Sequence, residues 1–305
     1  MTGRYKILIT TELPDGSTDP LAGHELVGGG TDVEGIVCQL TDRFSAEALD
    51  RYPELRVLAT VSVGFDHIDL DAATARGVAV CNTPGVLDET TADLAFGLII
   101  AASRLFGAAE ADLRAGRWTG FGLLDRLGRD VHGATLGVVG YGRIGRAVAR
   151  RAAGFDMAVL HHSRTPTGEP GFVAELEELL AAADVVSLHV PLTASTRHLI
   201  DRRRLALMKT TAVLVNTSRG PVVEEEALAD ALEEGRLFAA GLDVYEREPA
   251  VHPRLLAAPR AVLLPHVGSA TVATRTAMAR LACESVRGVL AGEVPATCLN
   301  PAVLA

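Results

Sequence analysis

The chain has 305 residues, 48% of them hydrophobic, and a net charge of −9 at pH 7. This length accommodates two domains with cores of their own, and the apolar content excludes a disordered chain. A pI near 5.5 argues against nucleic acid or anionic membranes as partners, because their binders carry a basic face. Lys6 and Lys209 are the only lysines, and neither follows a GxxxxG loop, which excludes a P-loop phosphotransferase.

The cysteines and the apolar stretches indicate the compartment. Cys38, Cys81, Cys283 and Cys298 are scattered and form no CxxC pair. This pattern is typical of a reducing compartment and favours neither a disulfide framework nor a zinc site, so no metal is expected. The N-terminus lacks a signal-type apolar region, and the most apolar stretch, 94–102, is too short to span a bilayer. A cytoplasmic protein is therefore expected.

The first hundred residues alternate short β-rich runs with helical stretches. The expected strands are residues 6–10, 35–40, 57–60 and 78–81, and the expected helices are 45–51 and 70–75. Such alternation predicts a small parallel α/β domain. Open α/β sheets bind ligands beyond the carboxyl ends of their strands, and the turn at Val63-Gly64 follows such an end. It is either a backbone site for an anion or an ordinary glycine turn.

A long apolar helix is expected from about residue 92 to residue 113, with Thr90 or Thr91 as its cap and Asp93 in its first turn. Its apolar residues exceed what one amphipathic face requires, so it should connect two domains and contact another subunit. Trp118, the only tryptophan, lies in the glycine-rich loop that follows. A single tryptophan usually serves packing rather than ligand binding.

The centre of the chain, residues 135–164, has the sequence TLGVVGYGRIGRAVARRAAGFDMAVLHHSR. It predicts a strand at 136–139, a helix at 144–153, a second strand at 157–160 and the turn Gly140-Tyr141-Gly142-Arg143-Ile144-Gly145. Gly140 allows the tight turn, Gly142 lets backbone approach a phosphate, and Gly145 lets helix and strand pack closely. The helix N-terminus offers unpaired N–H groups to the anion. We therefore predict a dinucleotide site at this turn.

The alternation continues beyond this motif. The expected strands are 185–190, 213–216, 239–244 and 262–264, and the expected helices are 175–181, 224–234 and 269–290, the last returning to the first domain before a tail at 294–305. Arg219, Glu248 and His266 follow three of these strands.

Reduction of a 2-oxo acid by hydride transfer needs that trio. Arginine grips a carboxylate with a planar fork and polarises the carbonyl. Histidine donates a proton near neutral pH, and a carboxylate beside an imidazole orients it. Taken singly, each residue is better explained without catalysis: Arg219 as a surface ion pair, Glu248 as a loop charge and His266 as a core histidine. Together, and downstream of the glycine turn, they favour catalysis; His189, at the end of another strand, is the nearest rival.

The chain resembles the D-isomer-specific 2-hydroxyacid dehydrogenases, and within them the glyoxylate/hydroxypyruvate reductases, over nearly its whole length. The segments that carry the resemblance are VSVGFDHIDLDA, NTPGVLDETTADLAFGL, AGRWTG, LGVVGYGRIGRAVARR, HVPLTASTRHLI, VLVNTSRGPVVEEEAL, AAGLDVYEREP and LLPHVGSAT. It implies the family's catalytic arginine, glutamate and histidine at Arg219, Glu248 and His266. It also implies a carboxylate-binding backbone turn at Val63-Gly64 and a nicotinamide-contacting aspartate at Asp243.

The resemblance also implies an α/β architecture of two doubly wound parallel-sheet domains. A Rossmann coenzyme domain at 101–284 is expected within a flavodoxin-like substrate domain of 1–100 and 285–305. Homodimers are usual in the family, and Trp118 is expected to reach the neighbouring subunit's substrate pocket. The other cofactor-binding residues expected are Tyr141, Arg143, Ile144, Val190, Pro191, Thr196, Thr217, Ser218, His266 and Gly268, and Ser269 is expected to bind substrate.

The cofactor itself is expected to be NADPH, with NADH as the alternative. An NAD-specific unit places an acidic residue about 20 positions beyond the glycines, to hold the ribose 2′-hydroxyl. Here the second strand runs into His-His followed by Ser163, Arg164 and Thr165, with no acid. These side chains suit a 2′-phosphate, unless Arg164 is merely a solvated loop cation.

Two other functions remain open at this point. The chain is either a dehydrogenase of the same family for a bulkier 2-oxo acid or phosphoglycerate, or a dinucleotide-sensing protein like the co-repressors that share this fold. The lack of an extra C-terminal regulatory domain weakens the phosphoglycerate alternative. The acidic balance and the lack of disordered tails favour an enzyme whose partner is a small 2-oxo or 2-hydroxy acid.

Overall fold

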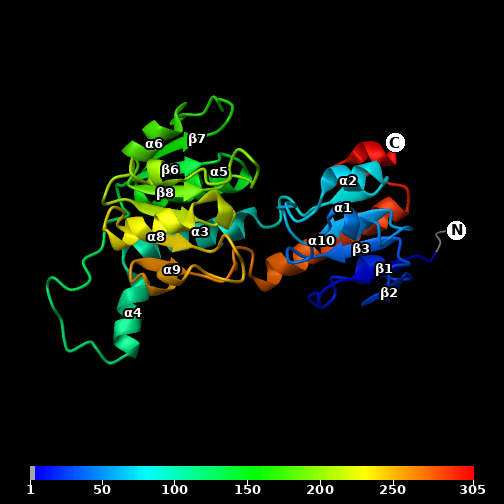
Figure 1. Ribbon diagram of the computed structural model, residues 1–305, viewed down its shortest axis with the longest axis horizontal. Helices are drawn as coiled ribbons and strands as arrows, with labels where there is room; N and C mark the ends of the chain where they lie inside the picture. The colour runs from blue at the N-terminus through cyan, green and yellow to red at the C-terminus, as the bar shows by residue number, and fades with distance from the viewer. Residues whose placement is uncertain (1–3) are drawn as a thin grey trace. The chain divides into compact units, whose positions relative to one another are not determined.

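The computed structural model describes residues 4–305, which divide into two compact units. Unit 1 combines the chain up to Leu87 with Ser269–Ala305, and unit 2 is Asp88–Gly268. Each unit contains one parallel β-sheet flanked by helices (Figure 1). The predicted α/β class, with one doubly wound domain inserted into another, is confirmed.

The chain enters unit 2 after Leu87 and returns to unit 1 after Gly268, whereas the expected boundaries were residues 100 and 284. Helix α3 (Asp88–Ser103) packs on the unit 2 sheet and on α5 (Arg143–Ala152), so all of it belongs to unit 2. Helix α10 (Val272–Leu290) packs on the unit 1 sheet. Each long helix therefore buries its apolar residues against a single sheet.

Unit 1 has the strand order β2-β1-β3-β4-β5, which is the flavodoxin-like order. Its elements are β1 (Lys6–Ile9), η1 (Asp19–Leu21), β2 (Glu25–Val27), β3 (Gly35–Cys38), α1 (Ala46–Leu49), β4 (Val57–Thr60), α2 (Leu70–Ala75), β5 (Ala79–Cys81), α10 and η4 (Pro301–Leu304). Strands β3 and β4 are buried on both faces, as parallel strands between helices are. Strand β2 was not predicted, because three residues, of which Glu25 and Leu26 are exposed, carry too little periodicity.

Unit 2 has the strand order β11-β10-β9-β8-β6-β7, and a bridge from His161 to Phe172 continues it beyond β7. Its elements are α3, α4 (Phe106–Arg114), β6 (Thr135–Val139), α5, η2 (Ala153–Phe155), β7 (Ala158–His162), α6 (Leu176–Ala182), β8 (Val185–Leu188), α7 (Arg202–Leu205), β9 (Val213–Asn216), η3 (Gly220–Val222), α8 (Glu225–Glu233), β10 (Ala239–Leu242), α9 (Pro253–Ala257) and β11 (Ala261–Leu263). The order reverses at β6, the strand that leads into the glycine turn.

The single helix expected over residues 92–113 is wrong. Helix α3 instead begins at Asp88 and ends at Ser103, so Thr90 and Thr91 lie inside it and not at its N-cap. Leu105 has a left-handed φ of 55°, and α4 continues at an angle of 67° to α3. The returning chain explains the break: Arg129 N–H donates to Ser103 O at 2.8 Å.

No single helix within residues 4–305 is long and apolar enough to cross a membrane. Among the described helices, the bent pair α3 and α4 meets that test when taken together, by length and composition alone.

Candidate active site

The glycine turn joins β6 to α5 as the sequence predicts. Gly140 has a φ of 95°, and a Cβ there would lie 2.5 Å from His189 O, so only glycine fits. A Cβ at Gly145 would lie 2.1 Å from Gly140 O, which makes this glycine necessary for close packing of helix and strand. The roles expected of both glycines in local structure are thus supported by their geometry.

The same turn has room for an anion. A Cβ at Gly142 would meet nothing within 4 Å, so the backbone is open to a ligand there. Gly142 is the N-cap of α5 without a side-chain cap, and the first turn contains no acidic residue. Across the sheet edge, Thr217 Oγ1 is buried without a hydrogen-bond partner among the described residues. An open backbone, a positive helix end and an unpaired buried hydroxyl fit a dinucleotide pyrophosphate.

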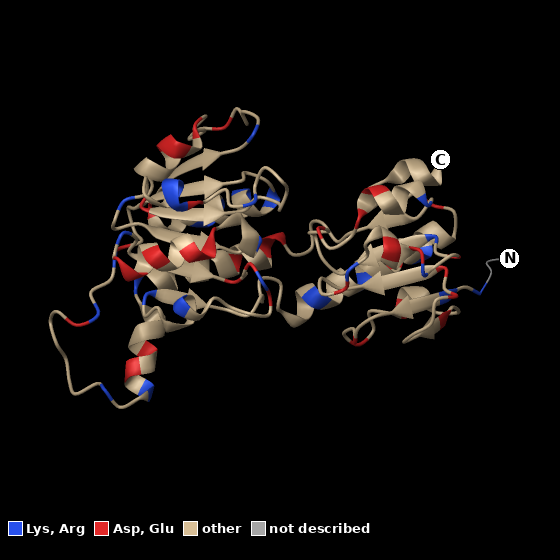
Figure 2. Ribbon diagram, viewed as in Figure 1, with Lys and Arg blue, Asp and Glu red and all other residues tan. Residues whose placement is uncertain are grey.

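The loop after β7 carries the residues expected at the ribose. Ser163 Oγ donates to Thr165 O at 2.7 Å, which closes a tight turn around Arg164. The Arg164 guanidinium has no hydrogen-bond or ion-pair partner within residues 4–305. Figure 2 shows positive charge in the loop that follows the strand labelled β7 in Figure 1. An unpaired cation beside two hydroxyl groups suits a phosphate.

Tyr141 of the glycine turn is held by its neighbours. Its ring stacks on the buried His161 ring at 3.7 Å between centroids and an interplanar angle of 12°. The Arg146 guanidinium lies 4.7 Å from the Tyr141 ring centroid and pairs with Glu169. Burial lowers the pKa of His161, so its ring is neutral at neutral pH. Tyr141 therefore fixes the turn from behind, a contact that the motif alone does not reveal.

The residues after β8 surround the turn on its other side. Val190 Cγ1 would lie 2.9 Å from a Cβ at Gly140, so this side chain packs on the glycine. Thr196 Oγ1 donates to Pro191 O at 2.6 Å, which commits that hydroxyl to the loop. The rival His189 bonds to Ser187 Oγ at 2.8 Å, and burial lowers the pKa of His189 to about 4. His189 is therefore neutral at neutral pH and has no proton to give as an acid.

Arg219 follows β9 in an extended conformation that Asn216 fixes. Asn216 is 1% exposed, and its Nδ2 donates to Arg219 O at 2.9 Å. Its Oδ1 accepts from Ser218 N at 3.0 Å and from Ser218 Oγ at 2.8 Å. Arg219 Nη1 donates to Ser218 O at 2.8 Å. This buried amide holds the Arg219 loop in shape, a role that sequence reasoning missed because one asparagine has no pattern.

The next residue brings the arginine loop to the glutamate loop. A Cβ at Gly220 would lie 1.8 Å from the backbone carbon of Tyr245, so the two segments touch directly. Glu246 N donates to Glu225 Oε1 at 2.7 Å, and Glu225 N donates to Glu246 Oε1 at 3.2 Å. This reciprocal pair fastens the segment before Glu248 to the start of α8.

His266 and Glu248 form the predicted pair. His266 Nδ1 lies 2.8 Å from Glu248 Oε2, and Glu248 Oε1 accepts from Tyr245 N at 3.0 Å. Burial acts to raise the pKa of Glu248, but the His266 hydrogen bond and charge, with the Tyr245 N–H and the Arg219 charge, lower it overall. The carboxylate is therefore ionised at neutral pH, and it accepts the Nδ1 proton of the imidazole. The structure thus brings all three residues of the trio together.

Asp243 fixes the backbone at His266 through hydrogen bonds. It is 1% exposed, and its two carboxylate oxygens accept from Val267 N and Gly268 N, both at 2.8 Å. His266 N donates to Asp243 O at 2.9 Å. Burial raises the pKa of Asp243, and the two N–H donors oppose that rise. His266 has a left-handed φ of 54°, which costs about 1–3 kcal/mol in a non-glycine residue, and these three bonds impose it.

Tyr245 connects the segment that precedes Glu248 to the segment that precedes His266. Its hydroxyl donates to Leu264 O at 2.9 Å, which ties the end of β10 to the segment before His266. Burial raises the pKa of Tyr245 to about 12.

In unit 1, the turn at Val63-Gly64 is held by side chains. Asn82 Nδ2 donates to Val63 O at 2.8 Å, and Ser62 Oγ donates to Gly64 O at 2.6 Å. Thr60 Oγ1 lies 2.8 Å from Ser62 Oγ. Among the described residues, the N–H groups of Val63 and Gly64 donate to no protein acceptor. The two carbonyls thus accept from side chains, while the two N–H groups remain available to a ligand. This arrangement favours an anion-binding turn over an ordinary glycine turn.

Ser269 and Trp118 are the two other residues expected to bind substrate. Ser269 begins the second part of unit 1, where its carbonyl accepts from Thr271 N at 2.8 Å. Trp118 is 66% exposed in the segment after α4, which extends away from the unit 2 sheet (Figure 1). Within residues 4–305 of one chain, Trp118 therefore stays largely exposed.

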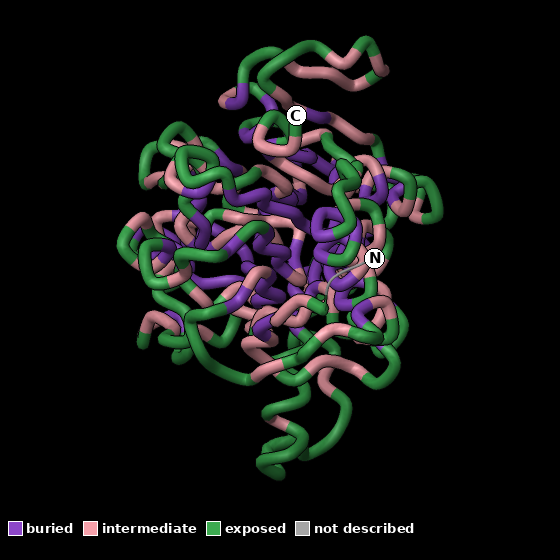
Figure 3. Tube along the Cα trace, turned by 90° about the vertical axis from the view of Figure 1, so that its right-hand side faces the viewer, coloured by how far each residue is buried: buried purple, intermediate pink, exposed green. Residues whose placement is uncertain are grey.

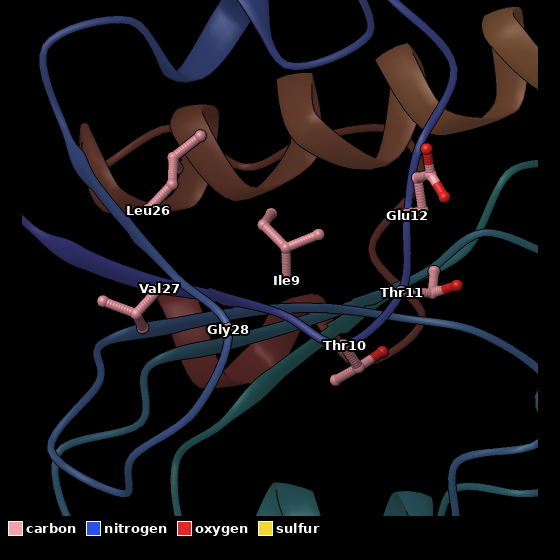
Figure 4. A pocket seen from close by; sticks show the side chains of 7 residues that line it. All are labelled: Ile9, Thr10, Thr11, Glu12, Leu26, Val27 and Gly28. Carbon is pink, nitrogen blue, oxygen red and sulfur yellow. The ribbon is translucent and has the colours of Figure 1, made fainter.

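Two hollows formed by the described residues lie away from the catalytic trio, which lines neither of them. One of ≈450 Å³ lies at the carboxyl ends of β1 and β2 (Figure 4), and its lining residues are Ile9, Thr10, Thr11, Glu12, Leu26, Val27 and Gly28. The other, of ≈330 Å³, lies behind the glycine turn, and its lining residues are Tyr141, Arg146, Ala149, Arg150, Val159, Glu169 and Pro170. The trio instead occupies the strand edge of unit 2, where the His266 and Glu248 side chains are 30% and 35% exposed.

Comparisons with known proteins agree with this geometry. Residues 96–268 match the model of the D-isomer specific 2-hydroxyacid dehydrogenase NAD-binding domain. A glyoxylate reductase of Thermococcus gammatolerans is 43% identical over 98% of this chain and 97% of its own. A glyoxylate reductase of Korarchaeum cryptofilum is 47% identical over 90% of this chain and 84% of its own.

Solved structures share the whole fold. A protein from Thermus thermophilus has a TM-score of 0.91 and 44% identity, covering 96% of this chain and 99% of its own. An NADPH-dependent glyoxylate/hydroxypyruvate reductase from Sinorhizobium meliloti, solved with NADP and malonate, has a TM-score of 0.89 and 35% identity, covering 98% of both chains. This chain therefore belongs to the D-isomer-specific 2-hydroxyacid dehydrogenase family, and it is an oxidoreductase that uses a nicotinamide dinucleotide.

Proposed function

We propose that this enzyme reduces a small 2-oxo acid, glyoxylate or hydroxypyruvate, to the D-2-hydroxy acid with NADPH. The observation that carries the proposal is the 2.8 Å pair of His266 and Glu248 with the Arg219 charge beside it. The relatives named glyoxylate reductase support the choice of substrate.

In this reaction His266 is the proton donor. Its Nδ1 proton is committed to Glu248, so Nε2 carries the proton that passes to the substrate oxygen as negative charge develops there. The bound reduced nicotinamide supplies the hydride. Glu248 is ionised, so it orients the ring and stabilises its protonated form. Asp243 is a positioning residue that holds the backbone of His266.

Arg219 and the Val63-Gly64 turn bind the substrate carboxylate. The guanidinium supplies paired donors to a carboxylate and polarises the adjacent keto group. The unpaired N–H groups of Val63 and Gly64 supply fixed donors that need no reorganisation. Ser269 is the further contact to substrate. In this proposal unit 1 is the substrate domain and unit 2 the coenzyme domain.

Unit 2 holds the coenzyme along its strand edge. Gly142, Arg143 and Ile144 face the pyrophosphate at the α5 N-terminus, and Ser163, Arg164 and Thr165 bind the 2′-phosphate. The remaining contacts in this proposal are Gly140, Tyr141, Gly145, Val190, Pro191, Thr196, Thr217, Ser218, Asp243, His266 and Gly268. NADPH is preferred to NADH because Arg164 is an unpaired cation and no carboxylate stands at the ribose.

The enzyme is a homodimer in this proposal. Segment 106–127 contains seven large apolar side chains that are each at least half exposed: Phe106, Leu113, Trp118, Phe121, Leu123, Leu124 and Leu127. Figure 3 shows α4 and the loop after it in the colour of exposed residues. So many exposed apolar side chains in one segment favour a partner, and a second copy of the chain supplies one. Trp118 then reaches the partner's substrate site. Light scattering of the wild type and of a Leu123→Asp, Leu124→Asp variant tests this, since the variant should be monomeric.

The function is tested by the loss of NADPH absorbance with a panel of 2-oxo acids. Glyoxylate and hydroxypyruvate should give the highest kcat/KM, and a bulkier 2-oxo acid or phosphohydroxypyruvate a much lower one. A protein that binds NADPH tightly but oxidises it with none of these acids is a dinucleotide sensor, and the proposal is then wrong.

A further inference from the structure

The C-terminal segment pairs with β5, the edge strand of unit 1, and this places two cysteines opposite each other. Leu299 N donates to Val80 O at 2.8 Å, and Asn82 N donates to Thr297 O at 3.2 Å. Cys81 and Cys298 are the antiparallel bridge partners between these two bonds. The segment is fixed further by Asn300, whose Oδ1 accepts from Val80 N at 2.8 Å and whose Nδ2 donates to Val78 O at 2.9 Å.

The pairing type decides how close the cysteines are. Both bonds join the neighbours of Cys81 and Cys298 and not the cysteines themselves, so this is the non-hydrogen-bonded type of antiparallel pair. In that type the Cα atoms lie about 4.5 Å apart and the side chains lean together. Disulfides span Cα distances of about 4.4–6.8 Å, so a bond fits without moving the backbone.

The two thiols differ in access. Cys81 is 0% exposed, whereas Cys298 is half-buried and donates a weak hydrogen bond to Asn300 Oδ1 at 3.6 Å. Burial, and next the neighbouring Cys298 thiol, raise the pKa of Cys81 to about 12. Cys298 is therefore the thiol that reacts with an external disulfide. Cys81 is the thiol that then attacks the mixed disulfide formed on Cys298.

We propose that Cys81 and Cys298 form a reversible disulfide that fastens the C-terminal segment to β5 when the protein meets a low-molecular-weight disulfide. This inference does not depend on the proposed function. The bond joins covalently the two parts of unit 1, which unit 2 separates in sequence. The pair is thus a redox-dependent crosslink within unit 1.

The chemistry balances as ordinary thiol–disulfide exchange. The Cys298 thiolate attacks one sulfur of the external disulfide, forms a mixed disulfide and releases one thiolate. Cys81 loses its proton to solvent and attacks the Cys298 sulfur, which expels the second external thiolate. Two protein thiols are oxidised and one disulfide is reduced to two thiols. The opposed geometry favours the internal bond over the mixed disulfide, because the second step is intramolecular.

The test is incubation of the folded enzyme with oxidised glutathione, then alkylation, thiol counting in denaturant and peptide mapping. Titratable thiols should fall from four to two, the intact mass should drop by two hydrogen atoms, and a Cys81–Cys298 linked peptide should appear. Dithiothreitol should reverse all three. The Tm of the oxidised protein should rise by roughly 5–10 °C, because a long loop is closed.

Variants separate this outcome from others. Cys38→Ser with Cys283→Ser should still form the bond, since it keeps the pair. Cys298→Ser should lose no thiol, and Cys81→Ser should stop at a glutathione adduct on Cys298. The proposal is overturned by a stable glutathione adduct on the wild type, a linkage to Cys283 or between chains, or unchanged thiols. If Cys81→Ser does not fold, the half-buried Cys298→Ser variant still decides the question.

Discussion

His266 Nδ1 lies 2.8 Å from Glu248 Oε2, although 18 residues separate the two in the chain. Glu248 also accepts from Tyr245 N, and Tyr245 bonds in turn to the segment before His266, so the pair is held from both ends. A carboxylate held in this way stabilises the protonated imidazole, the form that donates in reduction.

The first prediction concerns this pair. In Glu248→Gln the charge that pairs with His266 is lost, so the alkaline limb of the kcat/KM profile for reduction should move to lower pH. His266→Ala should lower kcat by about 10²–10⁴ with NADPH affinity unchanged. The measurement is kcat/KM for glyoxylate across pH. Glu226→Gln is the matched control, because Glu226 forms an equally short pair, 2.8 Å, with the surface His252. An unshifted profile in Glu248→Gln would separate Glu248 from the proton donor.

The second prediction concerns Arg219. Lysine keeps the charge but loses the planar fork, so Arg219→Lys should lower kcat/KM for the 2-oxo acid by about 10²-fold or more. The dissociation constant of NADPH should stay the same, as measured by nicotinamide fluorescence. Arg236→Lys, which changes a surface arginine paired with Glu234, should match the wild type. Full turnover in Arg219→Lys would remove this residue from the substrate site.

The third prediction concerns the coenzyme. Charged hydrogen bonds contribute about 1.5–3 kcal/mol, so kcat/KM should favour NADPH over NADH by roughly one to two orders of magnitude. Ser163→Asp with Arg164→Ala should reverse the order, because the new carboxylate repels a 2′-phosphate and accepts from ribose hydroxyls. Saturation curves with both coenzymes, on the double and the single variants, measure this. A wild type that already prefers NADH would contradict the role of Arg164.

The fourth prediction concerns the backbone turn of unit 1. Asn82→Ala removes the donor to Val63 O, so the turn loses its fixed shape. The KM for the 2-oxo acid should rise about tenfold, the loss expected for one hydrogen bond, with the KM for NADPH unchanged. Ser45→Ala, which removes the hydroxyl cap of α1 in the same unit, should leave both KM values unchanged. A rise in both KM values would indicate general damage and not a substrate turn.

The fifth prediction concerns stability and pH. The pKa of His189 falls from 6.5 to about 4 in the folded state, so the unfolded chain binds the extra proton between these values. The contribution of His189 to the free energy of unfolding is therefore fully present above pH 6.5 and is lost toward pH 4. The loss is about 1.4 kcal/mol per pH unit and about 3 kcal/mol in all. Urea unfolding of His189→Asn should show a shallower slope in this window. The exposed His132→Asn should keep the wild-type slope, and equal slopes in all three would contradict a buried neutral His189.

Several elements could be predicted from the sequence because they depend on neighbours in the chain. Strands β4 and β9 and helix α2 have the bounds that their apolar patterns predict. The glycine turn was predictable for the same reason, since its glycine spacing between a strand and a helix is a local pattern. The trio also followed from the sequence, because parallel strands place their carboxyl ends at one edge of a sheet.

Other features were decided only in three dimensions. The break after Ser103 depends on a chain segment that returns to it, so the local apolar pattern did not reveal it. Asn216 and Asn82 became positioning residues because their amides meet carbonyls in particular loops. Cys81 and Cys298 looked unrelated in a scattered set, and they oppose each other because the last segment pairs with an edge strand. Local pattern thus determined the elements and the chemistry they carry, whereas long-range packing determined which side chains hold that chemistry in place.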